Sequence, residues 1–306
     1  MTVFGFSPLF PGSAKKWLKL ADAEIYHSCE PSLTTYLAFK AMPDRKHMVT
    51  FRDPRDFSDW KMEYDLPSLS KLQVLHNYLY ENNRFVRKTI PKMHAVYTIG
   101  KYLIPKVRSM YGLSIDPQFL PTPVEIPPDV KKADVPTVCY AARLDRRKRP
   151  ELFLDLARKF PEVRFIAMGK SRDLKWDRHL REKYAGIPNL EMTGFVDQFG
   201  SKMHSGILEK SWIMVNTATR EALPNAFLEA AAHRCAILST VNPDNFSSEF
   251  GYYAKDGDLE SGLKDLLDRQ TWKQKGERAF RYILEAFELT KAIDRHVREY
   301  NRVLGN

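Results

Sequence analysis

Short apolar runs alternate with helical patterns along the second half of the chain. Runs rich in β-branched and aromatic residues predict buried strands. They lie at Thr137–Ala142, Val163–Met168, Leu190–Phe195, Trp212–Asn216 and Cys235–Thr240. Helical spacing of apolar residues follows Pro150 over 151–160 and Pro224 over 225–234, and proline is common in the first turn of a helix. Residues 131–270 therefore predict a doubly wound α/β domain with a parallel sheet.

The first 122 residues follow a less regular pattern. It predicts strands at Glu24–Ser28, His47–Phe51 and His94–Ile99, a helix at Leu33–Lys40 and one long helix at Lys71–Lys88. Residues 1–122 therefore predict a second α/β domain, with about three strands. Five prolines between positions 121 and 137 indicate a linker between the two domains.

The C-terminal stretch, residues 271–306, is charged and amphipathic. Its pattern predicts one or two terminal helices, after a shorter helical segment at 262–268. We expect these helices to return toward the N-terminal domain.

Composition excludes several classes of protein. The 306 residues are 43% hydrophobic and 28% charged, which is ordinary globular usage and excludes a disordered or collagen-like chain. No apolar run reaches the length of a membrane-spanning helix, and the N-terminal stretch MTVFGFSPLFPGSAKKW makes a poor signal peptide. Three widely spaced cysteines argue against a disulfide scaffold and a zinc site, so we expect a cytoplasmic protein.

The charge balance points to an anionic partner. Lys and Arg number 48 against 38 Asp and Glu, a net charge of +10. Residues 84–108 carry seven basic residues and no acidic one, interleaved with Phe85, Tyr97 and Tyr102. This stretch is either a peripheral contact with the inner face of an anionic membrane or a set of solvated helix faces. Nucleic acid is disfavoured, because no nucleic-acid-binding motif accompanies the charge.

Two loops of the second domain carry groups that could bind a ligand. Both leave strands at the carboxyl edge of the predicted sheet, where open α/β sheets bind their ligands. The loop at 143–149 offers Arg143 and Lys148, which suit phosphate oxygens. The loop at 217–224 offers Glu221 and leads into a helix whose first N–H groups suit an anion.

Glu229, on that helix, sits among apolar residues and needs a partner. The alternatives are an ion pair with an arginine and a contact with sugar hydroxyls; for the loop at 143–149, the alternative is a solvated basic turn. Taken together, the cations and carboxylates fit a nucleotide-sugar.

Two segments resemble retaining GT-B glycosyltransferases, specifically glycosyltransferase family 4. ALPNAFLEAAAHRCAILS, with Glu221 before it and Glu229 within it, resembles the family's E-x7-E segment. ARLDRRKRPE resembles its G-R-L-x-x-x-K segment, with Arg143 and Lys148 in register and Ala142 in place of the glycine. The segments GFVDQ and SWIMVNTATRE also follow the family's order, and the resemblance extends over residues 24–306.

The resemblance implies two Rossmann-like domains facing a cleft and a metal-independent transfer that retains the anomeric configuration. The donor is expected to be a nucleotide-diphosphate sugar, with UDP or GDP, and the acceptor a saccharide or a lipid-linked sugar. No cofactor is implied. Arg143, Lys148 and Glu221 are the implied catalytic residues. The implied donor-binding residues are Arg143, Lys148, Gly169, Phe195, Val196, Glu221, Leu223, Pro224, Asn225, Ala226 and Glu229.

The N-terminal half departs from the family pattern. EIYHSCEPSLTTYLA and MVTFRDPRD resemble two of its strand segments and offer His27, Arg52 and Asp53 as acceptor-side residues, with Arg52 where family members often have histidine. The first strand and its glycine-rich loop have no counterpart, which predicts a reduced N-terminal domain. The chain is then a minimal enzyme, a fragment, one part of a split enzyme completed by a partner chain, or a catalytically degenerate subunit that binds a nucleotide or a sugar.

Overall fold

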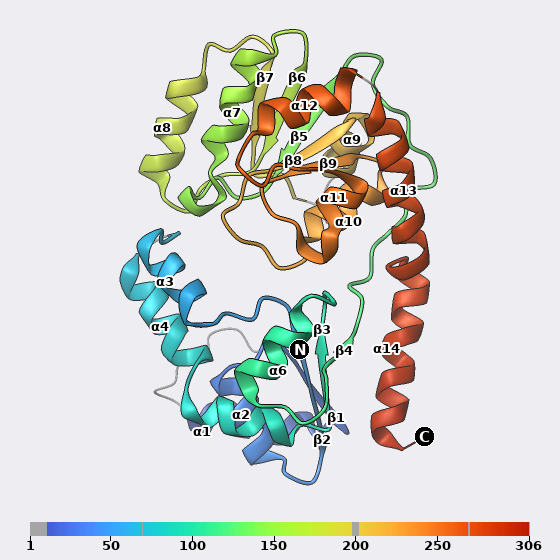
Figure 1. The fold of residues 1–306 in the computed structure, drawn as a ribbon. Helices are drawn as coiled ribbons and strands as arrows, with labels where there is room; N and C mark the ends of the chain where they lie inside the picture. The colour runs from blue at the N-terminus through green and yellow to red at the C-terminus, as the bar shows by residue number, and fades with distance from the viewer. Residues whose placement is uncertain (1–10, 69, 198–201, 269, 306) are drawn as a thin grey trace. The chain divides into compact units, whose positions relative to one another are not determined.

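The computed structural model of the protein describes residues 11–68, 70–197, 202–268 and 270–305. Its chain forms two compact units, each built on a parallel sheet (Figure 1). Unit 1 comprises Met1–Asp65, Ser70–Pro121 and Ile293–Asn306, and unit 2 comprises Leu66–Leu69 and Thr122–Ala292. Residues 1–10 of the stretch tested as a signal peptide, and Gln198 of GFVDQ, lie outside the described residues. The predicted α/β fold class is confirmed.

Unit 1 contains four parallel strands in sequential order. They are β1 (Ile25–Cys29), β2 (Lys46–Phe51), β3 (Ala95–Thr98) and β4 (Gln118–Phe119). Three of them match the predicted strands, and β4, with two residues, is too short to produce a recognisable pattern. Its helices are α1 (Pro11–Ala21), α2 (Leu33–Ala41), α3 (Phe57–Asp65), α4 (Lys71–Glu81), α5 (Arg84–Thr89), α6 (Leu103–Tyr111) and most of α14 (Leu289–Leu304).

Alternation along β2 gives unit 1 a core on both faces of its sheet. Val49 and Phe51 pack with Val86 of α5 and Val107 of α6 on one face, whereas Met48 packs on the other face. Successive side chains of a strand point to opposite faces, and all residues of β2 from 47 to 51 are buried. Parallel strands covered on both sides read as continuous apolar runs, which is why this strand is legible in the sequence.

The C-terminal helix α14 completes the second of these faces. Val303 belongs to the core cluster of Met48 and Tyr97, and Tyr97 Oη donates a hydrogen bond of 2.8 Å to Glu299. The last turns of α14 therefore belong to unit 1, although the preceding helix belongs to unit 2.

The prediction of one long helix over Lys71–Lys88 is wrong. The segment forms α4 and α5, separated at Asn82 and Asn83. The Asn83 side chain accepts hydrogen bonds from the backbone N–H groups of Phe85 and Val86, at 3.0 and 3.1 Å. An asparagine that caps the first turn in this way starts a new helix, and side-chain capping competes with continuation of the old one.

The basic stretch 84–108 does not form one continuous surface. Lys106 forms ion pairs with Asp56 and Asp59, and Arg108 forms one with Asp116. Tyr97, one of the aromatic residues interleaved with the basic stretch, is fully buried because it lies on β3, inside the sheet. Four exposed cations lie at the start of the stretch, on and just after α5: Arg84, Arg87, Lys88 and Lys92.

Unit 2 contains a six-stranded parallel sheet in the order β10-β9-β8-β5-β6-β7. The strands are β5 (Thr137–Ala141), β6 (Arg164–Met168), β7 (Leu190–Gly194), β8 (Ile213–Asn216), β9 (Ala236–Ser239) and β10 (Gly251–Tyr253). The first five agree with the predicted strands to within two residues at each end. The chain runs outward from β5 to β7, returns to β8 beside β5, and continues outward to β10 on the other side.

Helices cover both faces of this sheet (Figure 1). They are α7 (Pro150–Lys159), α8 (Leu174–Tyr184), α9 (Met203–Lys210), α10 (Asn225–Ala232), α11 (Phe246–Phe250), α12 (Leu259–Asp268) and α13 (Thr271–Ala286). Helices α7, α8 and α12 share one core cluster with Val138, Phe165 and Leu238 of the sheet, and α10 packs against α13 and β9. No helix among the described residues is long and apolar enough to cross a membrane.

Candidate functional site

The site lies in unit 2, where the strand order reverses between β5 and β8. The loop after β5 contains residues 142–149, and the loop after β8 contains residues 217–224. β5 and β8 are hydrogen-bonded neighbours and run parallel, so both loops leave the sheet at the same edge. A doubly wound sheet forms a crevice outside this reversal point, because adjacent loops there diverge to opposite faces.

Hydrogen bonds hold the loop after β5 against the loop after β8. Thr217 Oγ1 donates to the carbonyl oxygens of Lys148 and Arg149, at 2.6 and 2.9 Å. Thr219 N–H donates to the Arg147 carbonyl at 3.0 Å. The loop of cations and the loop of Glu221 therefore have a fixed register.

Arg149 also takes part in the hydrogen bonds between the two loops, a role that the sequence did not reveal. Its Nε donates to the Thr217 carbonyl at 2.7 Å, and its Nη2 donates to Ala218 O at 3.2 Å and Thr240 Oγ1 at 2.9 Å. Its backbone is left-handed, with φ of 46°, where a residue other than glycine needs support from its surroundings. Arg149 thus supports the loops, and the cations for a ligand are its neighbours.

Lys148 and Glu221 form an ion pair across the two loops. Both side chains are largely buried, at 14% and 15% exposed. Asn216, the last residue of β8, donates from Nδ2 to Glu221 Oε1 at 3.2 Å and accepts from the Ala218 N–H at 3.0 Å. The structure therefore brings together two of the three predicted catalytic residues directly, and an asparagine that the sequence did not reveal orients the carboxylate of the pair.

Arg143 is held at the same edge by a buried carboxylate. Its Nη1 lies 2.8 Å from Asp145 Oδ2, and Asp145 is fully buried. Asp145 also accepts hydrogen bonds from Ser171 Oγ and Arg172 N–H, at 3.1 and 3.2 Å, which ties the loops after β5 and β6 together. The Arg143 side chain is 36% exposed, so part of its guanidinium stays accessible.

The charge around Arg143 is strongly positive. Burial lowers the pKa of the Arg143 guanidinium, and the nearby cations Arg172 and Arg147 lower it further, against Asp145. An arginine stays charged under such a shift. The repulsion between these neighbouring cations is therefore not relieved by loss of a proton, and it creates a positive electrostatic potential at this edge of the sheet. An anion placed there would offset that repulsion.

Gly169 permits the close approach of two loops. It follows β6, with φ of +141°, and a Cβ atom at this position would lie 2.0 Å from the carbonyl oxygen of Ala142. Its N–H donates to the Gly194 carbonyl at 2.7 Å. A side chain here would separate the loop of Arg143 from the end of β6, so the position requires glycine.

Phe195 and Val196 follow β7 at the same edge of the sheet. Phe195 is exposed, and the Lys170 ammonium lies 5.7 Å from the centre of its ring. These residues lie two strands from β5, so they extend the edge away from the reversal point.

The start of α10 presents backbone donors next to Glu221. Pro224 is the N-cap residue, and the helix begins at Asn225, where the predicted segment 225–234 begins. Leu223 is buried and anchors the loop, whereas Asn225 is exposed and Ala226 half-buried. The first N–H groups of a helix have no acceptor within the helix, so this terminus can accept an anion beside the cations.

Glu229 faces a histidine. Among the described residues Glu229 lies against His204 of α9, with 3.6 Å between Nε2 and Oε2, rather than against the arginine considered from the sequence. The Glu229 side chain is 25% exposed, and burial raises its pKa. Burial lowers the pKa of His204. Near neutral pH a neutral imidazole leaves carboxylate oxygens available to hydroxyl donors.

Arg52 and Asp53 lie at the corresponding edge of unit 1. They directly follow β2, and their backbone N–H groups donate to one carboxylate oxygen of Glu30, at 2.8 and 2.7 Å. Glu30 directly follows β1 and has a left-handed backbone, with φ of 79°. Arg55 adds ion pairs to Glu63 at 3.1 Å and Glu81 at 2.8 Å. Glu30 and Arg55 were missed, although both lie within four residues of a predicted strand end.

His27 is placed elsewhere. It lies in the middle of β1, where Nε2 is 2.7 Å from Thr50 Oγ1 and Nδ1 is 3.0 Å from Tyr300 Oη. Burial, and secondarily the charge of His296, lowers the pKa of His27 to about 4. A neutral imidazole with both nitrogens engaged connects β1, β2 and α14, and the structure does not bring His27 together with Arg52 and Asp53.

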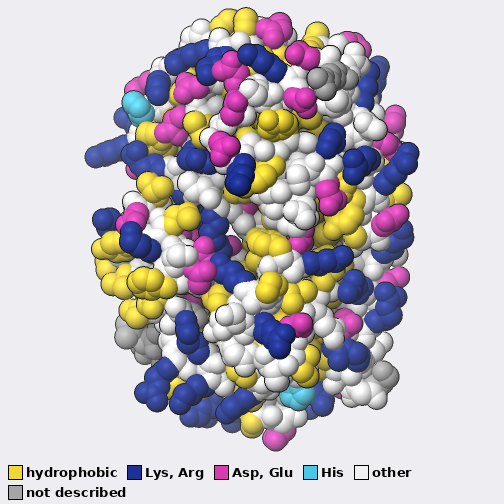
Figure 2. Space-filling model, in the orientation of Figure 1, with side chains coloured by type: hydrophobic (Ala, Val, Ile, Leu, Met, Phe, Trp, Pro, Cys, Tyr) yellow, Lys and Arg dark blue, Asp and Glu magenta, His cyan; other side chains and the backbone are white. Residues whose placement is uncertain are grey.

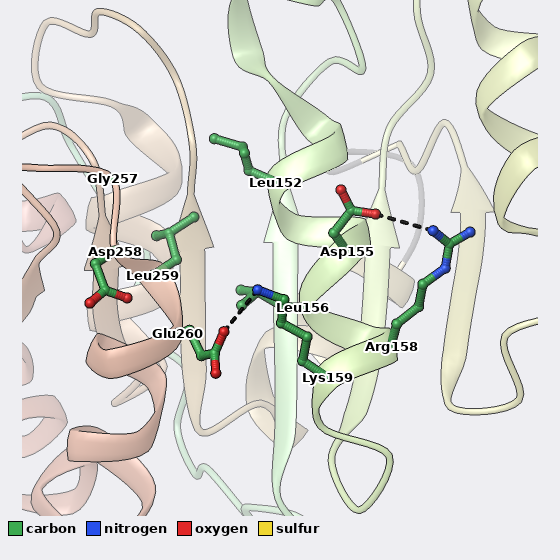
Figure 3. Close-up of a pocket in the computed structure, with 9 residues that line it drawn as sticks. All are labelled: Leu152, Asp155, Leu156, Arg158, Lys159, Gly257, Asp258, Leu259 and Glu260. Atoms are coloured by element: carbon green, nitrogen blue, oxygen red, sulfur yellow. Dashed lines mark hydrogen bonds and ion pairs between the residues drawn. The ribbon is translucent and has the colours of Figure 1, made fainter.

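A cavity of about 370 Å³ lies outside this site, between α7 and α12 (Figure 3). Its polar lining is occupied by ion pairs of its own, Lys159–Glu260 at 2.8 Å and Arg158–Asp155 at 3.4 Å. The described residues contain no group of three or more His, Cys, Asp or Glu side chains that could hold a metal ion.

Comparison with known proteins gives a family match and a fold. Residues 124–253, which include the whole candidate site of unit 2, match the family described as Glycosyl transferases group 1. No curated protein sequence matches the chain. Similar solved structures are those of GT-B glycosyltransferases, and both units share their Rossmann-like architecture.

Three solved structures illustrate the similarity. Sucrose-phosphate synthase from Thermosynechococcus elongatus aligns with a TM-score of 0.74 and 13% identity, over 97% of this chain and 78% of that one. TarM of S. aureus, in complex with fondaparinux, alpha-GlcNAc-glycerol and UDP, aligns with 0.68 and 12%, over 95% and 59%. The pneumococcal O-GlcNAc transferase GtfA, with UDP and GlcNAc, aligns with 0.69 and 10%, over 95% and 60%. The chain therefore spans about three fifths of TarM and GtfA.

Proposed function

We propose that the chain is a glycosyltransferase that takes a sugar from a nucleoside-diphosphate sugar and transfers it to a saccharide acceptor. The observation that carries the proposal is the set of hydrogen bonds that joins the two loops where the strand order reverses between β5 and β8. It holds Arg143, Lys148 and Glu221 at one edge of the sheet, beside the start of α10. The family match over residues 124–253 and the fold support a transferase.

The cations suit the leaving diphosphate. Arg143 can offer a guanidinium fork to phosphate oxygens, and Lys148 a point charge, while the N–H groups at the start of α10 add backbone donors. Such groups stabilise negative charge that develops as the bond to the sugar breaks. We propose that the protein's own cations perform this task and that transfer is metal-independent.

The carboxylates suit hydroxyl groups. Glu221 lies beside Lys148 and would contact the transferred sugar. Glu229, further along α10, would accept hydrogen bonds from the ribose. UDP is the nucleotide we favour, because it occupies the structures of TarM and GtfA. GDP is the alternative that the chain's own residues leave open.

We propose retention of the anomeric configuration, in line with the family 4 resemblance. The acceptor hydroxyl would attack from the side of the departing diphosphate, whose oxygen takes the acceptor's proton while the sugar–oxygen bond to the diphosphate breaks. This step needs no protein general base. Product anomers identified by proton NMR test it, and an inverted product would contradict it.

The acceptor is proposed to approach the edge of unit 1 that carries Arg52 and Asp53. Both residues follow a parallel strand at its carboxyl end, and carboxylate and guanidinium groups suit sugar hydroxyls. The proposed acceptor is a saccharide or a lipid-linked sugar.

Nucleotide binding and turnover test the proposal together. Calorimetry with UDP, GDP and ADP should reveal one preferred nucleotide, and the matching nucleotide-sugars should release nucleotide when the chain is added. No binding to any nucleotide would overturn the proposal. Binding without turnover by any donor would assign the chain to the alternative class, a nucleotide-binding subunit, which the engagement of Lys148 by Glu221 favours.

A further inference from the structure

Two histidines of unit 2 contact Glu229. His204 of α9 places Nε2 3.6 Å from one carboxylate oxygen of Glu229, and His233, the residue after α10, places Nδ1 2.7 Å from the Glu229 carbonyl oxygen. The chain has eight histidines, and those visible on the face drawn in Figure 2 lie far apart from one another. Glu229, in contrast, meets one imidazole at its side chain and another at its backbone.

The hydrogen bonds of His233 determine which of its ring nitrogens carries the hydrogen atom. The Glu229 carbonyl oxygen can only accept, so Nδ1 is the donor. Burial lowers the pKa of His233, so the imidazole is neutral near neutral pH and Nε2 is an acceptor. Ser205 Oγ, at 2.7 Å, therefore donates to Nε2. Through these two hydrogen bonds, His233 connects the start of α9 to the backbone of Glu229.

His204 directly precedes Ser205, so the same hydrogen bonds restrict where its imidazole lies. Helix α9 thereby contacts α10 and the residue after it at two points, Ser205 on His233 and His204 on the Glu229 carboxylate. Burial lowers the pKa of His204, so its imidazole is also neutral near neutral pH. Its ring can donate one N–H to the carboxylate without bringing a positive charge that competes with a hydroxyl ligand.

Exposure distinguishes the two side chains of this contact. The Glu229 side chain is 25% exposed and the His204 side chain is 14% exposed, so the carboxylate is more accessible to a ligand than the imidazole. The separation of 3.6 Å is slightly longer than a hydrogen bond, and hydrogen bonds of functional sites often shorten when the ligand binds. His204 is thus placed to hold one carboxylate oxygen and to leave the other for a ligand.

We propose that His204 is a positioning residue that orients the Glu229 carboxylate toward the ribose of the donor nucleotide. This inference rests on the proposed function and extends it, because it assigns a task to a residue that does not itself contact the donor. Donation from Nε2 to one carboxylate oxygen restricts rotation of the carboxylate before the ribose hydroxyls bind. Binding then orders fewer side-chain conformations, which increases the affinity for the nucleotide.

Nucleotides with and without ribose hydroxyls test this inference. His204→Leu removes the N–H donor and keeps most of the side-chain volume. In calorimetry it should weaken UDP binding about fivefold and leave the affinity for 2′,3′-dideoxy-UDP unchanged. His204→Gln, whose side-chain amide can donate a hydrogen bond, should bind UDP within about twofold of the wild type. If the chain prefers GDP, the same comparison uses GDP and its dideoxy analogue.

A double-mutant cycle shows whether His204 acts through Glu229. In a Glu229→Ala background, His204→Leu should cause no further loss of UDP affinity, because the carboxylate that it positions is gone. The matched control is His76→Leu, which changes an exposed histidine on α4 of unit 1 and should leave UDP affinity unchanged. Thermal unfolding by circular dichroism reports general damage, and His204→Ala takes the place of His204→Leu in the cycle if the leucine variant does not fold.

Two sets of results would overturn the inference while the proposed function stands. One is a His204→Leu variant that binds UDP like the wild type, or that loses equal affinity for UDP and its dideoxy analogue. The other is the same loss of UDP affinity in the wild-type and the Glu229→Ala backgrounds, because His204 would then act independently of the carboxylate. A wild-type chain that binds no nucleotide would instead overturn the proposed function, and the inference with it.

Discussion

The carboxyl edges of the two sheets have the same architecture and opposite charge. In unit 2 the edge gathers Arg143, Lys148 and neighbouring cations around two carboxylates. In unit 1 the edge gathers several carboxylates around Arg55. Parallel strands only determine that the loops meet at one edge, so residue choice in the loops decides what that edge can bind.

The consequence for protonation differs as well. In unit 1, burial raises the pKa of Glu30 to about 7 and that of Glu81 to about 7, and neighbouring carboxylates add to the rise while Arg55 opposes it. In unit 2, burial and like charges lower the pKa of Arg143 without removing its charge. Unit 2 therefore keeps a positive edge at all ordinary pH values, whereas the charge of unit 1's edge changes near neutrality.

The largest expected effect comes from removing a cation of the positive edge. Lys148→Ala should lower the turnover of the preferred nucleotide-sugar by about 100- to 1000-fold, because the leaving diphosphate loses a fixed charge and Glu221 loses its ion pair with Lys148. The rate of nucleotide release measures it. Lys159→Ala, which breaks an exposed ion pair on α7, is the matched control and should keep its rate. Equal rates for the two variants would contradict the assignment of Lys148.

The next largest effect should be a loss of folding stability when the carboxylate-rich edge of unit 1 loses Arg55. Arg55→Ala removes the partner of Glu63 and Glu81 in a largely buried cluster and should reduce the free energy of unfolding by about 3 kcal/mol. Urea unfolding followed by circular dichroism measures it. Arg45→Ala, which breaks an exposed pair with Asp22, should cost less than about 1 kcal/mol. A small loss in both variants would mean that the cluster of unit 1 is not held by Arg55.

The pH dependence of the unfolding free energy should also distinguish the carboxylate-rich edge of unit 1 from the positive edge of unit 2. The pKa of Glu30 and of Glu81 is raised from 4.5 to about 7 in the folded chain, so the folded state binds more protons than the unfolded state between these values. The contribution of these groups is fully present below about pH 4.5 and is lost as the pH rises through about 7. At about 1.4 kcal/mol for each pKa unit, the shift of each carboxyl is worth roughly 3 kcal/mol, so we expect a decline of at least about 3 kcal/mol from this cause.

A neutral isostere tests that cause. Glu30→Gln keeps a carbonyl oxygen for the N–H groups of Arg52 and Asp53 and has no proton to lose. Its unfolding free energy should therefore vary less between pH 5 and pH 8 than that of the wild type, in urea titrations at each pH. A parallel pH profile for the variant and the wild type would show that Glu30 does not titrate in this range.

The smallest expected effect concerns the ribose. Glu229→Ala should weaken UDP binding about tenfold, because a hydrogen bond to a charged group is worth roughly 1.5–3 kcal/mol and part of it is replaced by water. The same variant should bind 2′,3′-dideoxy-UDP with nearly the wild-type affinity, which separates loss of a ribose contact from general damage. Calorimetry measures both. Equal losses for the two nucleotides would remove Glu229 from the ribose.

Periodicity was sufficient for most of the strands and for some of the helices. The strands β1, β2, β3 and β5 to β9, and the helices α2, α7 and α10, follow runs that are legible because both faces of each sheet are buried. The break between α4 and α5 was not legible as apolar spacing, because it depends on one capping asparagine. The two-residue strand β4 exists only through its pairing with β3.

The candidate site was predictable in part. Arg143, Lys148 and Glu221 were found because they sit in loops that leave predicted strands at one edge, and because their spacing resembles a known family. Asn216, Arg149, Asp145 and His204 were not found, because their roles depend on partners up to 91 residues away in the chain. His27 lay on a predicted strand, but the helix that engages it comes from the far C-terminus.

The sequence by itself determined which segments become strands and helices and, through the direction of parallel strands, which loops share an edge. This follows because burial of apolar faces imposes a period that any reader of the chain can detect. Only the tertiary structure decided how charges combine at those edges. Whether a carboxylate meets a lysine, a histidine or other carboxylates depends on the final path of loops that have no period, and the resulting burial and neighbouring charges set its pKa.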